Sequence, residues 1–256
     1  MRRTRTRAGL LTVAALVTLV ASAMLASGAT ARTHADPLTI YAAASLTEVF
    51  KALDGAQHFS FAGSNALETQ IRNGAPVDVF ASAAPLNTQR LFKAGIVDKP
   101  VTFTANRLAL IVPKSNPAGI RSIYDLRSKP VKLVVAAPAV PAGGYTLSVL
   151  RKMGLSSVLS KVVSRESDVK AVTGKVALGQ ADAGFVYVTD ARPVSDQVSV
   201  IRIPALAQPR VRYEIAVVTK SPNKTAAQAW VRMILSAKGQ TALKHAGFLP
   251  LPKASS

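Results

Sequence analysis

The sequence contains no cysteine in its 256 residues. This absence excludes disulfide bonds, thiolate zinc sites and cysteine nucleophiles, and it excludes a lipoprotein anchor because that anchor is an acylated cysteine. Histidine is almost as scarce: His34, His58 and His245 lie far apart along the chain. No cluster of histidine and acidic residues has the spacing of metal ligands, so no metal-ion site is expected.

Acidic residues are also few, with 13 Asp and Glu against 32 Lys and Arg, which gives a formal net charge of +19. A nucleic-acid-binding chain would show clustered basic residues interleaved with aromatic ones. Aromatic residues make up only 5% of this chain and its basic residues are scattered. We therefore expect no nucleic-acid partner and interpret the charge as a solvated surface. Attraction of an anionic ligand or of an anionic envelope surface is the alternative.

Enzyme motifs are missing as well. The chain has no G-x-S-x-G, no G-x-x-x-x-G-K-[ST] and no G-x-G-x-x-G sequence. Two S-x-x-K matches, at 167–170 and 221–224, lack the S-D-N and K-T-G companions that serine hydrolases of that type carry. The chain is predicted not to be an enzyme, and a secreted serine hydrolase stays only as a remote alternative.

The N-terminus has the parts of a secretory signal peptide. "MRRTRTR" is positively charged, the run from Leu10 to Leu25 is apolar, and small residues suited to cleavage follow. We predict a signal peptide over residues 1–35, cleaved after about residue 31 or 35, and a location in the periplasm. Loss of residues 1–31 removes four arginines and no acid, so +19 becomes +15. The alternative is an uncleaved membrane anchor, although the apolar run is short for a membrane span.

Short β-branched runs alternate with segments of helical periodicity along the rest of the chain. Strands are predicted at 38–43, 58–63, 77–83, 107–113, 131–137, 183–189, 198–204 and 213–219. Helices are predicted at 46–54, 65–73, 85–94, 122–127, 144–153, 167–178 and 224–246. Strands separated by helices of this length predict parallel sheets joined by right-handed crossovers.

Two extended runs, 106–117 and 212–223, both contain Lys-Ser and are both broken by proline. We interpret them as paired strands that cross between two lobes. Lobe 1 is predicted to comprise residues 36–105 plus 221–256, and lobe 2 residues 106–220. The fold class is then α/β, with a mostly parallel sheet flanked by helices in each lobe. The ligand cleft is expected between the lobes because α/β sheets bind ligands at the carboxyl ends of their strands.

Two junctions between a strand and a helix share one pattern. Ser45 follows three alanines in "YAAASLTEVF", and Ser64 follows Ala62 and Gly63 in "FAGSNALETQ". A helix start offers unpaired backbone N–H groups and the positive end of a dipole, and tiny residues let a ligand approach them. With the serine hydroxyl they form an anion site that needs no cationic side chain. The alternative is that both serines are ordinary helix N-caps.

Three further positions could complete such a site. Proline and glycine residues in the segment 137–150 expose backbone N–H groups just before a helix. Ser167 or Asp168 can cap the next helix, whose first turn contains Val169. Tyr187 lies at the carboxyl end of an apolar strand, where its hydroxyl needs a partner if the side chain is buried.

Taken together, these segments resemble the periplasmic molybdate-binding proteins of ATP-binding cassette importers. The segments are "LTIYAAASLTEVF", "FAGSNALETQIRNGAPVDVFASA", "VPAGGY", "SDV", "GFVYVTDA" and the ending "SAKGQTALKHAGF". The resemblance covers essentially the whole mature chain and implies a type II periplasmic binding protein fold that closes on a tetrahedral oxyanion. By position, it implies that Ser45, Ser64 and Tyr187 donate through their side chains. It also implies that Ala142 and Val169 donate through their backbone N–H groups.

The resemblance implies that the protein captures molybdate, and tungstate with it, and delivers the anion as a monomer to the membrane permease of the importer. No cofactor is implied, and molybdenum enters only as the oxyanion held by the five residues. The sequence departs from the family pattern in two places. Asn65 stands where the family commonly has another hydroxyl residue, and the segment 46–57 is shorter than usual.

The chemistry of a site made only of hydrogen-bond donors limits which anions it can bind, and this argument does not depend on the resemblance. Such a site suits molybdate, tungstate or sulfate, which carry no proton at neutral pH. Monohydrogen phosphate would leave its own donor unpaired, at a cost of about 1–3 kcal/mol. A binding protein of the same fold for sulfate, thiosulfate or a small organic acid is therefore the main alternative. Organic acids are commonly clamped by arginine, but Arg72, Arg107 and Arg165 do not stand at helix starts.

Overall fold

The structure is a computed structural model that describes residues 36–250. The signal peptide predicted over residues 1–35 lies outside the described residues. Within them, no helix combines the length and the apolar character that crossing a membrane requires. The chain from Pro37 onwards forms the unit described below.

The first sheet has the strand order β2-β1-β3-β10-β4. Its strands are β1 (Thr39–Ala43), β2 (His58–Ala62), β3 (Val79–Ser82), β4 (Val101–Asn106) and β10 (Val211–Val217). Strand β1 pairs in parallel with β2 and β3, whereas β10 runs antiparallel to both β3 and β4. Four of the five strands therefore point in one direction and β10 is reversed.

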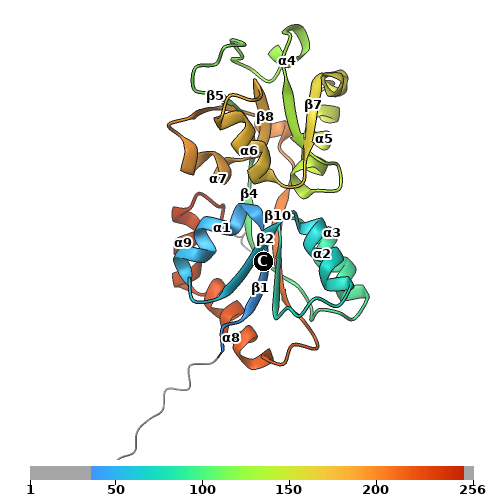
Figure 1. Ribbon diagram of the computed structural model, residues 1–256, viewed down its shortest axis with the longest axis vertical. Coiled ribbons are helices and arrows are strands. Elements are labelled where there is room, and N and C mark those ends of the chain that lie inside the picture. Colours follow the sequence, from blue (N-terminus) through green and yellow to red (C-terminus); the bar gives the residue numbers. More distant parts are fainter. Residues whose placement is uncertain (1–35, 251–256) are drawn as a thin grey trace, which may run out of the picture. The chain divides into compact units, whose positions relative to one another are not determined.

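The second sheet repeats this plan with the order β7-β6-β8-β5-β9. Its strands are β5 (Leu108–Pro113), β6 (Leu133–Ala136), β7 (Val162–Glu166), β8 (Ala183–Tyr187) and β9 (Val198–Arg202). Strand β6 pairs in parallel with β7 and β8, and β5 runs antiparallel to β8 and β9. In each sheet the reversed strand is the one that has just arrived from the other sheet, since β5 follows β4 and β10 follows β9 (Figure 1). The predicted α/β class with two lobes and mostly parallel sheets is confirmed.

Helices cover both sheets (Figure 1). They are α1 (Thr47–Leu53), α2 (Ser64–Arg72), α3 (Pro85–Lys93), α4 (Asp125–Ser128), α5 (Pro141–Lys152), α6 (Val169–Ala177), α7 (Val188–Ala191), α8 (Lys224–Leu235) and α9 (Ala237–His245). Short 3₁₀ turns are η1 (Ala44–Leu46), η2 (Ser156–Lys161), η3 (Arg192–Val194) and η4 (Ala205–Ala207). Helix α1 contacts α9, so both ends of the described chain build the first lobe.

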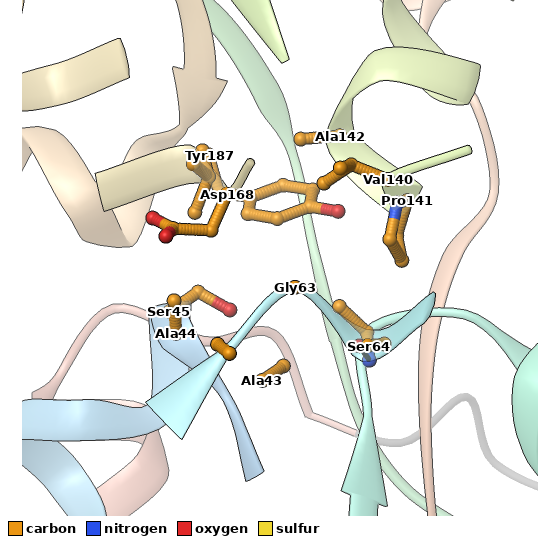
Figure 2. Close-up of a pocket in the computed structure, with 13 residues that line it drawn as sticks. Ala43, Ala44, Ser45, Gly63, Ser64, Val140, Pro141, Ala142, Asp168 and Tyr187 are labelled. Atoms are coloured by element: carbon orange, nitrogen blue, oxygen red, sulfur yellow. Dashed lines mark hydrogen bonds between the residues drawn. The ribbon is translucent and has the colours of Figure 1, made fainter. Parts of the chain in front are cut away.

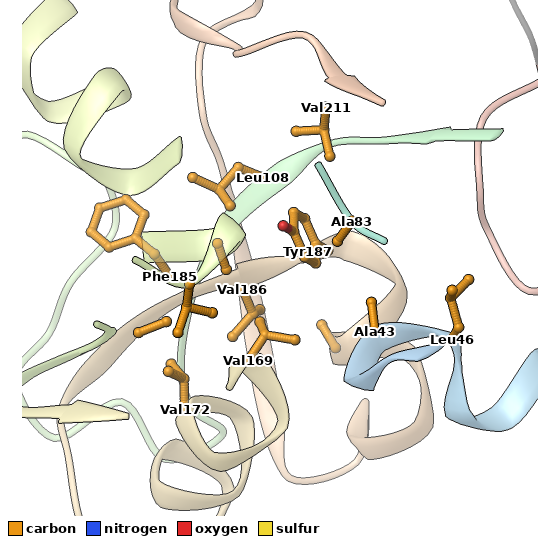
Figure 3. Packing of buried hydrophobic residues seen from close by; sticks show 14 of the residues in the cluster. Ala43, Leu46, Ala83, Leu108, Val169, Val172, Phe185, Val186, Tyr187 and Val211 are labelled. Carbon is orange, nitrogen blue, oxygen red and sulfur yellow. The ribbon is translucent and has the colours of Figure 1, made fainter. Parts of the chain in front are cut away.

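The hydrophobic core explains why these elements pack as they do. Leu67 and Ile71, one helical turn apart in α2, are both buried, as expected for an amphipathic helix on a sheet. Figure 3 shows α6 in the second lobe, where Val169 and Val172 pack beside the β8 residues. Where the lobes meet, the first lobe presents small side chains such as Ala43 opposite Tyr187. These small residues leave room for the pocket described below.

Some predicted elements differ from the structure. The single helix predicted over 224–246 is two helices, because Ser236 adopts an extended backbone and its hydroxyl accepts a hydrogen bond from the Gly239 N–H to cap α9. Strands β4 and β7 were not predicted. Both lie at sheet edges. Strand β4 (VTFTAN) alternates apolar and polar residues and could have been predicted, whereas β7 (VVSRE) ends in three polar residues and has no such period.

The predicted crossing between the lobes also needs correction. The runs 106–117 and 212–223 do not pair with each other: β5 pairs within the second sheet and β10 within the first. Residues 211–217 were assigned to lobe 2, yet their hydrogen bonds place them in the first sheet. The chain returns between β9 and β10, in a proline-bounded segment that the sequence pattern did not distinguish from the strands around it.

Candidate functional site

A small pocket lies between the two lobes (Figure 2). It is lined by Ala43, Ala44, Ser45, Ala62, Gly63, Ser64, Ala83, Val140, Pro141, Ala142, Asp168, Val169 and Tyr187. Its cavity volume is about 10 Å³, which is roughly what one water-sized sphere needs. Sites for drug-sized ligands are larger by more than a factor of ten, at about 300–1,000 Å³. The pocket therefore suits a compact ligand of few atoms.

All five residues predicted from the sequence line this pocket. Ser45 lies in η1, Ser64 begins α2, Ala142 lies in the first turn of α5, Val169 begins α6 and Tyr187 ends β8. The first two come from the first lobe and the other three from the second. The structure thus brings together residues that are up to 142 positions apart in the chain. That they bind a ligand stays a prediction.

The two serines are not helix N-caps, so that alternative is wrong. The N-cap positions are Ala43 and Gly63, and no side-chain capping bond is made at either helix start. The Ser64 Oγ instead accepts a hydrogen bond from the Ala83 N–H at 3.0 Å. The Ser45 Oγ lies 2.8 Å from the Tyr213 hydroxyl. Each serine is therefore held by a partner from a distant part of the first lobe.

The contact to Ala83 determines what Ser64 can offer a ligand. A serine hydroxyl has one hydrogen and two lone pairs. In Ser64 the backbone N–H of Ala83 occupies a lone pair, and this N–H can only donate. The hydroxyl hydrogen remains free, and Ser64 is buried at the pocket wall. Ser64 is thus arranged as a hydrogen-bond donor toward the pocket.

Tyr187 supplies a donor from the second lobe. Its hydroxyl is buried and has no hydrogen-bond partner among the described residues. In Figure 2 the ring extends across the pocket above Gly63, with its oxygen on the side of Val140 and Pro141. Burial raises the pKa of Tyr187 well above 10, and the neighbouring Tyr213 adds to this shift. The phenol therefore keeps its proton, and a buried hydroxyl without a partner indicates a place where a ligand acceptor fits.

Backbone donors come from the starts of α5 and α6. Ala142 and Val169 lie in the first turns of these helices, where an N–H group has no intrahelical acceptor. Helix α5 can begin here because residue 143 is glycine. A Cβ on Gly143 would lie 2.1 Å from the Ala137 carbonyl oxygen. The positive ends of both helices thus border the pocket.

The pocket has no cationic side chain: no Lys, Arg or His occurs among the described residues that line it. Asp168 is the acidic residue there, and its Oδ1 accepts a hydrogen bond from the Ala171 N–H at 3.0 Å. This carboxylate caps α6, as the sequence predicted. The lining therefore presents hydroxyl and amide hydrogens rather than positive charge.

Gly63 brings the two lobes into close contact beside the pocket. A Cβ at this position would lie 2.5 Å from the Ser167 carbonyl oxygen of the second lobe. The ion pair between Lys170 on α6 and Glu48 on α1 also spans the lobes. The same region contains Asn65, whose Oδ1 is buried without a partner among the described residues. The structure is thus closed around the pocket.

Asp190 is a buried carboxyl next to the site that was not predicted from the sequence. Its Oδ2 accepts a hydrogen bond from the Tyr187 N–H at 3.3 Å, and its Oδ1 has no partner among the described residues. Burial raises the pKa of Asp190 to about 7, although Lys170 and the Tyr187 N–H lower it. Glu48 and Asp168 add small upward shifts. Its signal in the sequence is weak, because an aspartate three residues after a strand is also common in plain helix starts.

Fold and site together define a two-lobe solute-binding protein with a small pocket in its cleft, to which the described residues contribute no cationic side chain. The profile of the bacterial extracellular solute-binding proteins matches residues 38–249. The chain is 35% identical to the molybdate-binding protein ModA of Mycobacterium tuberculosis, over 92% of this chain and 93% of the relative. This protein belongs to the bacterial extracellular solute-binding protein family, and the resemblance to molybdate-binding proteins is confirmed. This family and this relative are solute-binding proteins, which confirms the prediction that the chain is not an enzyme.

Solved structures support the same fold. The Azotobacter vinelandii periplasmic molybdate-binding protein superposes with a TM-score of 0.76 at 22% identity, covering 84% of this chain and 100% of that one. The sulfate-binding protein SubI from Mycobacterium tuberculosis superposes with a TM-score of 0.74 at 20% identity, covering 86% and 88%. At these identities the likeness establishes the fold alone, and the two proteins bind different anions.

The buried carboxyl of Asp190 predicts a specific pH dependence of stability. The pKa rises from 3.8 to about 7 on folding, so between these values the folded protein binds more protons than the unfolded chain. The free energy of unfolding therefore falls as pH rises toward 7. Asp190→Asn keeps an oxygen for the Tyr187 N–H and does not titrate. The free energy of unfolding of Asp190→Asn relative to the parent should increase by a few kcal/mol between about pH 4 and pH 7. The difference between the two melting temperatures should grow with it.

Thermal unfolding of both proteins in the same buffers across this range would measure the difference. Asp182→Asn provides a control, because Asp182 is an aspartate whose side chain accepts a hydrogen bond from the Lys132 N–H at a partly exposed site. A constant difference between Asp190→Asn and the parent at all pH values would show that Asp190 does not titrate in this range.

Proposed function

We propose that this protein captures molybdate in the periplasm, binds tungstate in the same way, and delivers the anion as a monomer to the permease of an ATP-binding cassette importer. The observation that carries the proposal is the unpartnered, buried Tyr187 hydroxyl facing a pocket whose described lining offers hydroxyl and amide donors and, apart from the capping carboxylate of Asp168, no charged side chain. We assign Ser45, Ser64 and Tyr187 as side-chain donors and Ala142 and Val169 as backbone donors to the oxyanion.

The donor-only lining favours an anion without a proton. Each hydroxyl or amide hydrogen at the wall can meet an oxygen of molybdate, tungstate or sulfate. A hydrogen on monohydrogen phosphate would need an acceptor. Both oxygens of the Asp168 carboxylate already accept hydrogen bonds, Oδ1 from the Ala171 N–H and Oδ2 from the Ser167 hydroxyl. Leaving a donor unpaired in a buried site disfavours phosphate by about 1–3 kcal/mol. The small cavity further disfavours organic acids.

The choice of molybdate over sulfate rests on the relatives. The two anions share charge and tetrahedral shape, so hydrogen-bond chemistry does not separate them. The relative at 35% identity over nearly the whole chain is a molybdate-binding protein. The sulfate-binding protein is similar at 20% identity, where only the fold is shared. Sulfate is therefore the second candidate ligand, and a direct comparison of anions separates the two.

Ligand-linked stability tests the proposed ligand. A ligand that binds only the folded protein stabilises it by about 2.7 kcal/mol at 100 times its dissociation constant. Millimolar molybdate and tungstate should raise the melting temperature clearly, sulfate should raise it less, and phosphate should leave it unchanged. Differential scanning fluorimetry with the four sodium salts at equal ionic strength measures this order. Equal shifts from molybdate and phosphate would contradict the proposal, because charge alone would then be sensed.

Substitutions test the assigned donors. Ser45→Ala, Ser64→Ala and Tyr187→Phe each remove one donor to a charged ligand, a loss of roughly 1.5–3 kcal/mol. Each should weaken molybdate binding by about one to two powers of ten in a calorimetric titration. Val169→Ala keeps the backbone N–H and should change the affinity little.

Val169→Pro is the matched variant that deletes this N–H. Val169 is the first residue of α6, where proline is well tolerated, so the helix should remain. Its affinity for molybdate should fall as far as in the serine variants. Parent-like binding by both serine variants would mean that the anion is held elsewhere.

A further inference from the structure

The positions of the two oxygens do not show which hydroxyl donates in the hydrogen bond between Ser45 and Tyr213. The oxygens lie 2.8 Å apart, and either hydroxyl could donate. The direction matters because a serine that donates to Tyr213 has no hydrogen left for a ligand. A serine that accepts from Tyr213 keeps its hydrogen for the pocket. The surrounding network decides between these two arrangements.

Asn106, at the end of β4, fixes the first step of this network. Its Oδ1 accepts a hydrogen bond from the Arg107 backbone N–H at 2.8 Å. A backbone N–H can only donate, so the amide atom that faces it must be the oxygen. The amide nitrogen then faces Thr189 Oγ1 at 2.9 Å and the Tyr213 hydroxyl at 3.4 Å. Its two hydrogens serve these two oxygens.

Tyr213 transmits this orientation to Ser45. Its hydroxyl oxygen accepts from the Asn106 amide, so its own hydrogen requires another acceptor. Among the described residues, the Ser45 Oγ is the acceptor within hydrogen-bond distance. If Ser45 donated instead, the Tyr213 hydrogen would be buried without a partner, since Tyr213 is fully buried. With an anion in the pocket to accept from Ser45, both hydroxyl hydrogens have acceptors only when the hydrogen bonds run from Asn106 to Tyr213 to Ser45.

We propose that Tyr213 is a positioning residue that holds Ser45 as a donor to the bound oxyanion. Asn106 sets the direction in which the hydrogen bonds between these residues run. This rests on the proposed function of the pocket. Asn106 lies where the chain leaves the first sheet, and Thr189 belongs to the second lobe. The hydroxyl of Ser45 is thus oriented from the point where the two lobes are joined. A chain of three hydrogen bonds also strengthens its last donor.

A double-mutant cycle tests whether Tyr213 acts through Ser45. Molybdate affinity is measured by calorimetry for the parent, Tyr213→Phe, Ser45→Ala and the double variant. Tyr213→Phe should weaken binding about 3- to 10-fold in the parent, the size of one neutral hydrogen bond. In the Ser45→Ala background the same change should alter affinity less than about twofold, because the residue through which it acts is gone. Equal losses in both backgrounds would overturn the proposal.

Tyr145→Phe is the matched control. Tyr145, Tyr187 and Tyr213 form a cluster of aromatic rings, in which the ring of Tyr187 lies 6.5 Å from that of Tyr145 and 5.9 Å from that of Tyr213. The Ser45 hydroxyl bonds to Tyr213 and not to Tyr145. Its effect should be the same in the parent and in the Ser45→Ala background. Coupling of Tyr145→Phe to Ser45 as strong as that of Tyr213→Phe would mean that the cluster acts only by packing, and would also overturn the proposal.

Asn106→Asp keeps the proposal testable if Tyr213→Phe does not fold. A carboxylate can only accept, so the Tyr213 hydrogen would turn toward it and Ser45 would donate to Tyr213. Binding should then fall nearly as far as in Ser45→Ala, and the two losses should not add. If Asn106→Asp weakened binding equally in the parent and in the Ser45→Ala background, the proposal would be contradicted, because the loss would then come only from repulsion by the new carboxylate.

The cycle is run with whichever of molybdate, tungstate and sulfate binds the parent best. A preference for sulfate would refute the proposed ligand. The coupling between Tyr213 and Ser45 would still be measured, so the two failures are distinguishable.

Discussion

The proposed binding of a dianion in a closed pocket without a cationic side chain is the constraint on which our account of this structure depends. Such an anion is stabilised only by donors already aimed at it, and a donor is free only when the protein offers it no other acceptor. Ser64 meets this condition by accepting from the Ala83 N–H, and Tyr187 by having no partner. Ala142 and Val169 meet it through helix geometry, which leaves their N–H groups without intrahelical acceptors.

The fold supplies these donors by directing strand ends of both sheets toward one cleft. In each sheet four strands share a direction, and the reversed strand is the one that has crossed from the other lobe. At two points, the elements around the pocket can approach each other closely only because a residue there has no side chain. Gly143 lets α5 begin against β6, and Gly63 lets the first lobe reach the Ser167 carbonyl of the second. The excess of basic residues lies away from this chemistry, since no cation lines the pocket in the described part of the chain.

Much of the fold and many of the pocket residues could be predicted from local sequence patterns. The serines after strands, the glycine-containing start of α5 and Tyr187 at a strand end are features of short segments, and all proved to line one pocket. The edge strands β4 and β7 and the return through residues 203–210 were not predicted. Strand β4 does alternate apolar and polar residues, whereas β7 and residues 203–210 lack a distinct period. The roles of Tyr213 and Asn106 were not predicted for a different reason. Their roles depend on hydrogen bonds across 168 and 83 positions, which no local pattern encodes.

The salt dependence of molybdate affinity tests most directly whether neutral donors hold the anion. Scattered surface charges are screened by salt and act mainly on the association rate, whereas donors inside the closed pocket are screened little. Calorimetric titration in sodium chloride from about 0.02 to 0.5 M, with stopped-flow association rates alongside, separates the two effects. The account predicts a dissociation constant that stays within about threefold while the association rate falls. A dissociation constant that rises tenfold or more, about 1.4 kcal/mol, would place a lysine or arginine in contact with the anion and contradict it.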